Sequence, residues 1–386
     1  MTTTPYASSP FSYVSEPPAA PNAIAELMPG VRNLLRHVQL RPDDRVLILT
    51  EHTADPVVIQ AVAAGAAYEG ADVRILSVPP FSPGGWDAEP SLQVEVAAVG
   101  QADVVVSATW WAEVHTAPLF FDQVMAMPVR FASLHMAATA GAFLTGARFP
   151  NELFYALKQR ALSRLTEAAT IRVTSASGTD LTMSGLTFAP DGGPIQTGTW
   201  QPFPYGGANF WPTHTEGVLV VEDSTFTGVP DEPVRVTLRD NRVSAIEGGA
   251  AAEQIRRRAP GGYYMRHALI GLNPKVRIAG GTQFEREKHA GAFYCGLDAL
   301  TGGVAETTAP GFAHCDCQID RPTVHLDGEL FVDRGRLLLL DDPDLREVAA
   351  RFGPPDVLLD DNPLLILPAR YAGGRPAPES RPLTPA

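Results

Sequence analysis

The chain has 386 residues, a formal net charge of −13 at pH 7, 45% hydrophobic residues and 19% charged residues. This length exceeds what one hydrophobic core usually serves, and the composition is that of an ordinary globular protein, so we expect two domains. The acidic charge argues against a nucleic acid partner, and the lack of any run of 18 apolar residues argues against a membrane span.

The first residues are rich in Pro and Ser, with neither the basic segment nor the apolar core of a secretory signal. We therefore expect residues 1–22 to form a disordered tail and the protein to be cytoplasmic. The three cysteines, Cys295, Cys315 and Cys317, lie close together in a chain without an export signal, which favours reduced thiols.

Residues 23–165 alternate between helical and strand patterns. An amphipathic helix is predicted over residues 23–40, and the apolar run 46–49 predicts a buried strand. Further helices and strands are expected at residues 56–69, 72–78, 92–99, 102–109, 129–133 and 151–168. This alternation predicts an α/β N-terminal domain with a parallel sheet. No glycine-rich turn follows the first strand, which excludes a dinucleotide site.

From residue 166 to residue 345 the pattern is β-rich. Two such runs flank the turn residues 177–180 and predict a hairpin, and Asp240-Asn241 and Asp327-Gly328 are further turn signals. We expect a mainly antiparallel α+β C-terminal domain over residues 166–345, which would carry the metal site. A Pro/Gly-rich C-terminal tail is expected over residues 346–386.

Residues 312–320 carry the densest chemical signal. In an extended strand, residues two apart share a face, so His314 and Asp316 would point to one side and Cys315 and Cys317 to the other. An imidazole and a carboxylate on one face are two thirds of the triad that holds non-haem Fe(II), although a surface strand can show the same pattern. A thiolate site from the cysteines is disfavoured, because C-x-C lacks the spacing of structural zinc sites.

Other histidines have two interpretations each. His267 precedes the turn at residues 271–274 within an apolar run, where a histidine is more often a core residue than a metal ligand. His115 follows the third parallel strand, at the sheet edge where open α/β folds place their clefts, so it is either an acid/base group or a loop residue. His52 and Asp55 occupy the equivalent edge after the first strand. Neither G-x-S-x-G nor H-E-x-x-H occurs.

Three segments, residues 216–249, 263–278 and 314–338, carry a family resemblance in that order. The chain resembles the M29-type metallo-aminopeptidase superfamily, and within it looks most like the 2,5-dihydroxypyridine 5,6-dioxygenase branch. The similarity spans residues 24 to 340. Where the peptidases have a glutamate before a G-x-N-P turn, this chain has His267, and residues 287–294 carry Ala, Phe or Tyr at the place of a further histidine ligand.

The resemblance implies one Fe(II) held by His267, His314 and Asp316, with His115 as the acid/base. Three protein ligands leave positions for a chelating aromatic substrate and O₂. The ring-contacting segment of the pyridine-diol enzymes corresponds to residues 200–204, with Pro202 where histidine would stand. The candidate substrate-binding residues are Trp200, Phe203 and Trp211, although packing between the domains explains such aromatic residues equally well.

We therefore predict a mononuclear non-haem Fe(II) dioxygenase that cleaves or oxygenates a hydroxylated aromatic or N-heteroaromatic ring. One alternative is an M29-like metallohydrolase, an aminopeptidase with two Zn or Co ions, whose second ion would be bound by residues such as Glu285, Glu287 or Glu306. Another is a non-catalytic binding protein on the same fold. The resemblance also implies a homo-oligomer.

Overall fold

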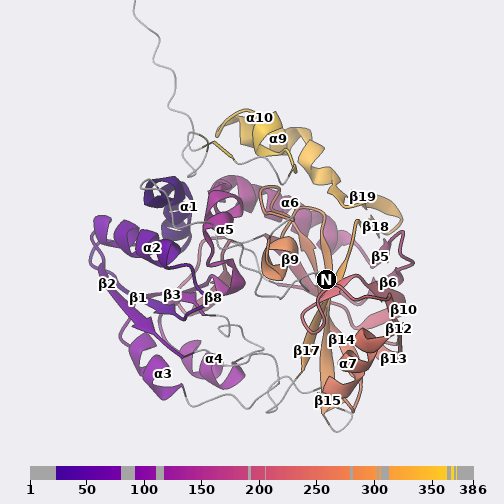
Figure 1. Ribbon diagram of the computed structural model, residues 1–386. Helices are drawn as coiled ribbons and strands as arrows, with labels where there is room; N and C mark the ends of the chain where they lie inside the picture. The colour runs from indigo at the N-terminus through magenta and orange to yellow at the C-terminus, as the bar shows by residue number, and fades with distance from the viewer. Residues whose placement is uncertain are drawn as a thin grey trace, which may run out of the picture.

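The computed structural model describes residues 23–79, 92–109, 117–189, 193–204, 206–278, 281–301, 304–305, 313–362, 367–368 and 371. A parallel sheet with helices forms the N-terminal part, and a larger, curled antiparallel sheet forms most of the C-terminal part (Figure 1). The predicted fold class is confirmed. The expected tail over residues 1–22 lies outside the described residues. No helix in the described part of the chain is long and apolar enough to span a membrane.

The N-terminal part alternates helices and strands as predicted. Its elements are α1 (Ala23–His37), β1 (Arg45–Thr50), α2 (Pro56–Tyr68), β2 (Asp72–Ser77), α3 (Gln93–Val99), β3 (Val104–Ala108), α4 (Pro118–Val124), β4 (Arg130–Ser133), η1 (His135–Ala137), α5 (Ala140–Leu144), η2 (Gly146–Arg148) and α6 (Asn151–Glu167). The strands pair in the order β2-β1-β3-β4, and all these pairs are parallel. Strand β3 is buried along its whole length, which explains its continuous apolar sequence.

One strand of this sheet comes from the part of the chain that we assigned to the second domain. Strand β8 (Thr199–Pro202) pairs in parallel with β4, so the chain crosses back to the first sheet between β7 (Thr187–Phe188) and β9 (Gly207–Trp211). Four residues are too few for a periodicity to reveal which sheet they join. The crossing ties the two parts of the molecule together.

The large sheet is built mainly from hairpins. Its remaining strands are β5 (Thr170–Thr174), β6 (Asp180–Ser184), β10 (His214–Val221), β11 (Asp223–Ser224), β12 (Val234–Arg239), β13 (Arg242–Glu247), β14 (Tyr263–Gly271), β15 (Phe293–Thr301), β16 (Val304–Ala305), β17 (His314–Ile319), β18 (Thr323–Leu326), β19 (Glu329–Asp333) and β20 (Arg336–Leu337). The main path runs β11-β17-β15-β14-β13-β12-β10-β6-β5-β18-β19-β20. Helices α7 (Ala250–Arg258) and α8 (Gln283–Arg286) lie in the connections on either side of β14.

The structure differs from our expectation at the C-terminus. Residues 346–350 belong to α9 (Pro343–Ala350) and residues 355–358 form α10 (Pro355–Leu358), so this stretch is not an irregular tail. The side chain of Asp342 caps α9 by accepting a hydrogen bond from the backbone N–H of Leu345, and Leu345 and Ala349 are buried at helical spacing. The Pro-rich composition hid this short amphipathic pattern. Figure 1 shows α9 and α10 along the outside of the molecule.

Candidate metal centre

Three neighbouring strands bring the predicted metal ligands into one row. Gly296 on β15 pairs with His267 on β14 and with Asp316 on β17. Paired residues share a face of a sheet, and His314 joins the same face because it lies two residues before Asp316. Cys315 and Cys317 are fully buried on the opposite face, as the strand periodicity predicts.

A β-bulge directs His267 to this face. The register between β14 and β15 shifts by one residue between Met265, which pairs with Leu297, and His267, which pairs with Gly296. Arg266 is therefore an extra residue in β14. Because of it, Met265 lies on the core face and His267, two residues later, lies on the opposite face. Bulges of this kind redirect side chains and are frequent beside functional sites.

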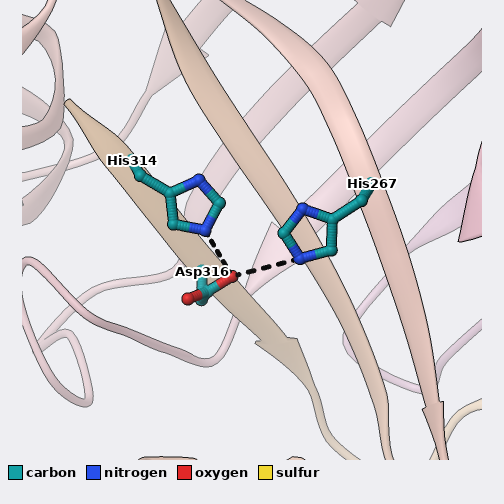
Figure 2. Close-up of side chains that lie close together, drawn as sticks. All are labelled: His267, His314 and Asp316. Atoms are coloured by element: carbon teal, nitrogen blue, oxygen red, sulfur yellow. Dashed lines mark hydrogen bonds and ion pairs between the residues drawn. The ribbon is translucent and has the colours of Figure 1, made fainter. Parts of the chain in front are cut away.

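The side chains of His267, His314 and Asp316 converge on one point (Figure 2). Their potential ligand atoms all lie within 4.8 Å of one another. Oδ1 of Asp316 is 3.0 Å from Nε2 of His314 and 3.8 Å from Nε2 of His267. The two imidazole rings are stacked, with 5.2 Å between centroids and 6° between planes. Within the described ranges, this is the one group of three or more His, Cys, Asp or Glu side chains with such spacing.

Gly296 provides the space for this arrangement. A Cβ atom at position 296 would lie 2.3 Å from Cε1 and 2.6 Å from Nδ1 of His267. The imidazole therefore lies directly over the backbone of the middle strand, where a side chain would prevent it. Two imidazole nitrogens and a carboxylate oxygen in this cradle fit a divalent cation of the iron or zinc type.

The electrostatics of the site also fit a cation. Burial and the neighbouring His314 lower the pKa of His267 to about 4, so its imidazole is neutral at pH 7, as a ligand must be. Burial disfavours charge on His314 as well, but Asp316 and Asp298 outweigh it and raise the pKa of His314 well above its usual value. A proton on His314 therefore occupies a site of negative potential that a metal ion can fill.

Several contacts around the triad were not predicted. Nδ1 of His314 forms a hydrogen bond with Oδ1 of Asp298, which pairs with His314 across β15 and β17. The backbone N–H of Asp316 donates to Oγ1 of Thr225 at 3.0 Å. In the sequence, Asp298 is marked only by its spacing of two residues from Gly296, which places both residues on one face of β15. This spacing points to the metal centre only once the pairing of β15 with β17 is known.

The other predicted site residues are more dispersed. His115 lies outside the described residues. Trp200 on β8 is half-buried, with its ring 6.0 Å from that of Phe121, and Phe203 is buried against Phe143. The contacts of Trp200 and Phe203 are those of residues packed in the N-terminal part. Trp211 alone comes from a strand next to β14, one position after Phe210, which pairs with Ala268.

The glutamates considered for a second metal ion have cationic partners. Glu285 accepts hydrogen bonds from Arg277, with Nη2 to Oε1 at 3.2 Å, and completes a capping box at the start of α8. Glu287 forms an ion pair with Lys288. Glu306 lies outside the described residues. Neither of the two described glutamates belongs to the converging group.

Comparisons with known proteins agree with the sequence resemblance. A family model described as NicX, 2,5-dihydroxypyridine 5,6-dioxygenase, matches residues 26–339. The structure of 2,5-dihydroxypyridine dioxygenase from Pseudomonas putida KT2440 is similar, with a TM-score of 0.66 and 20% identity over 85% of this chain and 99% of that one. AmpT from Thermus thermophilus is also similar, with a TM-score of 0.56 and 12% identity over 82% of this chain and 100% of that one.

No curated protein sequence matches the chain significantly. The two solved structures share its fold, and the family model covers most of its length. The predicted resemblance is therefore confirmed, and the chain belongs to the NicX family of ring-cleaving 2,5-dihydroxypyridine 5,6-dioxygenases.

Proposed function

We propose that this protein is a mononuclear Fe(II) dioxygenase that opens a hydroxylated aromatic or N-heteroaromatic ring. The observation that carries the proposal is the convergence of His267, His314 and Asp316 on one point. Family membership over residues 26–339 supports the same chemistry. An Fe(II) ion on two histidines and one carboxylate keeps adjacent positions open for a chelating substrate and O₂.

The residues of the chain prepare the site for such an ion. A neutral His267 can offer the lone pair of Nε2 without first losing a proton. The carboxylate of Asp316 supplies charge, while the N–H of the same residue donates a hydrogen bond to Oγ1 of Thr225. The cationic partners of Glu285 and Glu287 favour a single ion, because each carboxylate charge is already compensated.

We propose that His115 moves a proton to or from the ring hydroxyl. It follows β3 in the sequence, and open α/β folds place their clefts at the carboxyl ends of parallel strands. A histidine titrates near neutral pH, which suits a group that accepts a hydroxyl proton and later returns it. For ring recognition we propose Trp211, because its strand β9 is hydrogen-bonded to the ligand strand β14. By the resemblance, Pro202 stands where the pyridine-diol enzymes have a ring-contacting histidine, and we propose that the preferred ring differs in its polar substituents.

Elemental analysis of protein purified without oxygen tests this proposal. We expect about one iron per chain and O₂ uptake with a pyridinol or catechol-like substrate. With ¹⁸O₂, both labelled atoms should enter a ring-opened product. Two zinc or cobalt ions per chain together with hydrolysis of aminoacyl amides would instead establish a metallohydrolase. A protein that binds no metal would end the proposal and leave a binding function.

A further inference from the structure

Asp298 connects the metal-ligand face with three residues of the neighbouring strands. It is 1% exposed, and on β15 it pairs with both His314 and Tyr264, so it lies on the face of the triad. Its two carboxylate oxygens have different partners. Oδ1 contacts Nδ1 of His314, while Oδ2 lies 3.3 Å from the hydroxyl of Tyr264 and 3.5 Å from Nε of Arg266.

These contacts determine which nitrogen of the His314 ring carries the proton when the other nitrogen binds a metal. A histidine that binds a metal through Nε2 must carry its proton on Nδ1, and a hydrogen-bond acceptor at Nδ1 determines that choice. Asp298 is such an acceptor. Nε2 of the same ring points to Asp316, at 3.0 Å from Oδ1. The ring is therefore held at both nitrogens, with its metal-binding nitrogen directed into the triad.

We propose that Asp298 is a positioning residue of the metal centre: it holds His314 with Nδ1 protonated and increases the affinity of Nε2 for the cation. The inference rests on the proposed function, because it assigns His314 as a ligand. Asp298 is not itself a member of the converging group. Carboxylate–histidine–metal arrangements orient the ring and raise its basicity, and their loss reduces metal affinity by roughly 10–100-fold.

The β-bulge contributes to this unit as well. Arg266 is the extra residue of β14, and its guanidinium lies beside Oδ2 of Asp298. The side chain of Arg266 is 43% exposed, whereas that of Asp298 is 2% exposed. Arg266 therefore approaches the buried carboxylate from the solvent side and leaves Oδ1 for His314. The same β-bulge thus positions both His267 and Arg266, the cationic partner of Asp298.

Cobalt(II) binding to the metal-free full-length protein tests the proposal. We compare the wild type with Asp298→Ala, Asp298→Asn and the control Asp44→Asn. Asp44 is a buried carboxylate of the N-terminal part, with Oδ2 2.8 Å from Nη2 of Arg130. Competition titration gives the affinity, and the visible absorption of bound cobalt reports ligand geometry. Proton NMR detects the hydrogen on Nδ1 of His314.

We expect Asp298→Ala to weaken cobalt binding by roughly 10–100-fold and to remove the downfield Nδ1–H resonance of His314. Asp298→Asn should lose less affinity, because its amide oxygen can still accept the Nδ1–H. Asp44→Asn should bind cobalt as the wild type does. If Asp298→Ala fails to fold, Asp298→Asn and Tyr264→Phe provide the same comparison with smaller losses.

Two outcomes would overturn the inference alone: folded Asp298 variants with wild-type affinity and an unchanged Nδ1–H resonance, or an equal loss of affinity in Asp44→Asn. A wild-type protein that binds no cobalt would overturn both this inference and the proposed function. The failure of one is therefore distinguishable from the failure of the other.

Discussion

Two buried histidines, one in each part of the molecule, show how neighbouring groups determine the effect of burial on the pKa of an imidazole. His37 of the N-terminal part is fully buried, with Nδ1 2.9 Å from the hydroxyl of Tyr155. Burial, assisted by Lys158, lowers its pKa to about 3. His314 of the C-terminal part is 5% exposed, but two carboxylates flank it and raise its pKa well above the usual value. The first site excludes a cation and the second favours one.

In this fold, the groups beside a buried imidazole therefore determine whether it can take part in chemistry. A neutral partner such as Tyr155 satisfies an imidazole and leaves it as part of the core. Asp316 and Asp298, brought beside His314 by strand pairing, create a negative site instead. The hydrogen-bond register of β15 and β17 therefore matters as much as the residue types.

His314→Ala should abolish stoichiometric metal binding. It removes one of three ligands, so the loss of affinity should exceed the roughly 10–100-fold cost of losing an outer-shell partner. Metal content after dialysis measures this. The matched variant His37→Gln should retain its metal, even with lower stability, because His37 lies in the other part of the molecule. Equal metal loss in both variants would contradict the contrast.

Gly296→Ala should disrupt the site while leaving the sheet intact. The new methyl group would lie 2.3 Å from Cε1 of His267, so the imidazole must move away from the other ligands. We expect a loss of cobalt affinity of about 10–100-fold, similar to the loss of a positioning contact. Gly193→Ala is the control, since among the described residues, apart from its chain neighbours, no atom lies within 4 Å of its new Cβ. Unchanged affinity in Gly296→Ala would show that the ring does not occupy this cradle.

Acid should destabilise the N-terminal part through His37. The pKa of His37 is about 3 in the folded protein and about 6.5 in the unfolded chain. As the pH falls, the unfolded chain therefore takes up the proton first. The free energy of unfolding should therefore decrease between about pH 6.5 and pH 3, by on the order of a few kcal/mol from this group. Between pH 7 and pH 4.5, the free energy of unfolding measured with urea should decrease less for His37→Gln than for the wild type. Equal decreases in the two proteins would contradict the lowered pKa of His37.

Thr225→Val should have a small effect on stability and almost none on the metal. Its hydroxyl accepts the backbone N–H of Asp316 at 3.0 Å, and valine removes that acceptor at similar volume. The cost should be about 1–2 kcal/mol in the free energy of unfolding, measured by urea denaturation. A large drop in cobalt affinity would instead indicate that this anchor positions the carboxylate.

Patterns within single segments were predictable. The apolar runs gave the parallel strands, and the alternation in β17 placed His314 and Asp316 on one face, opposite Cys315 and Cys317. His267 was not accessible in this way, because the extra Arg266 breaks the alternation in β14. Only the resemblance to a known family identified it as a candidate ligand.

What depended on contacts between distant segments could not be predicted. Asp298 lies 16 residues before His314, and nothing in the sequence shows that they pair. The same limitation applies to Gly296, whose role is visible only beneath the His267 ring, and to β8, which joins the first sheet. The roles assigned to His115 and to the aromatic residues stay predictions.

The extra residue in β14 has a consequence for related proteins. If Arg266 paired with Gly296 as in a regular strand, His267 would pair with Cys295 and point to the face occupied by the cysteines, although every ligand would still be present in the sequence. A change in the strand pairing at this place, rather than an exchange of a histidine, is therefore enough to abolish the centre. Relatives that retain both histidines and the aspartate should be sorted first by whether they keep this bulge.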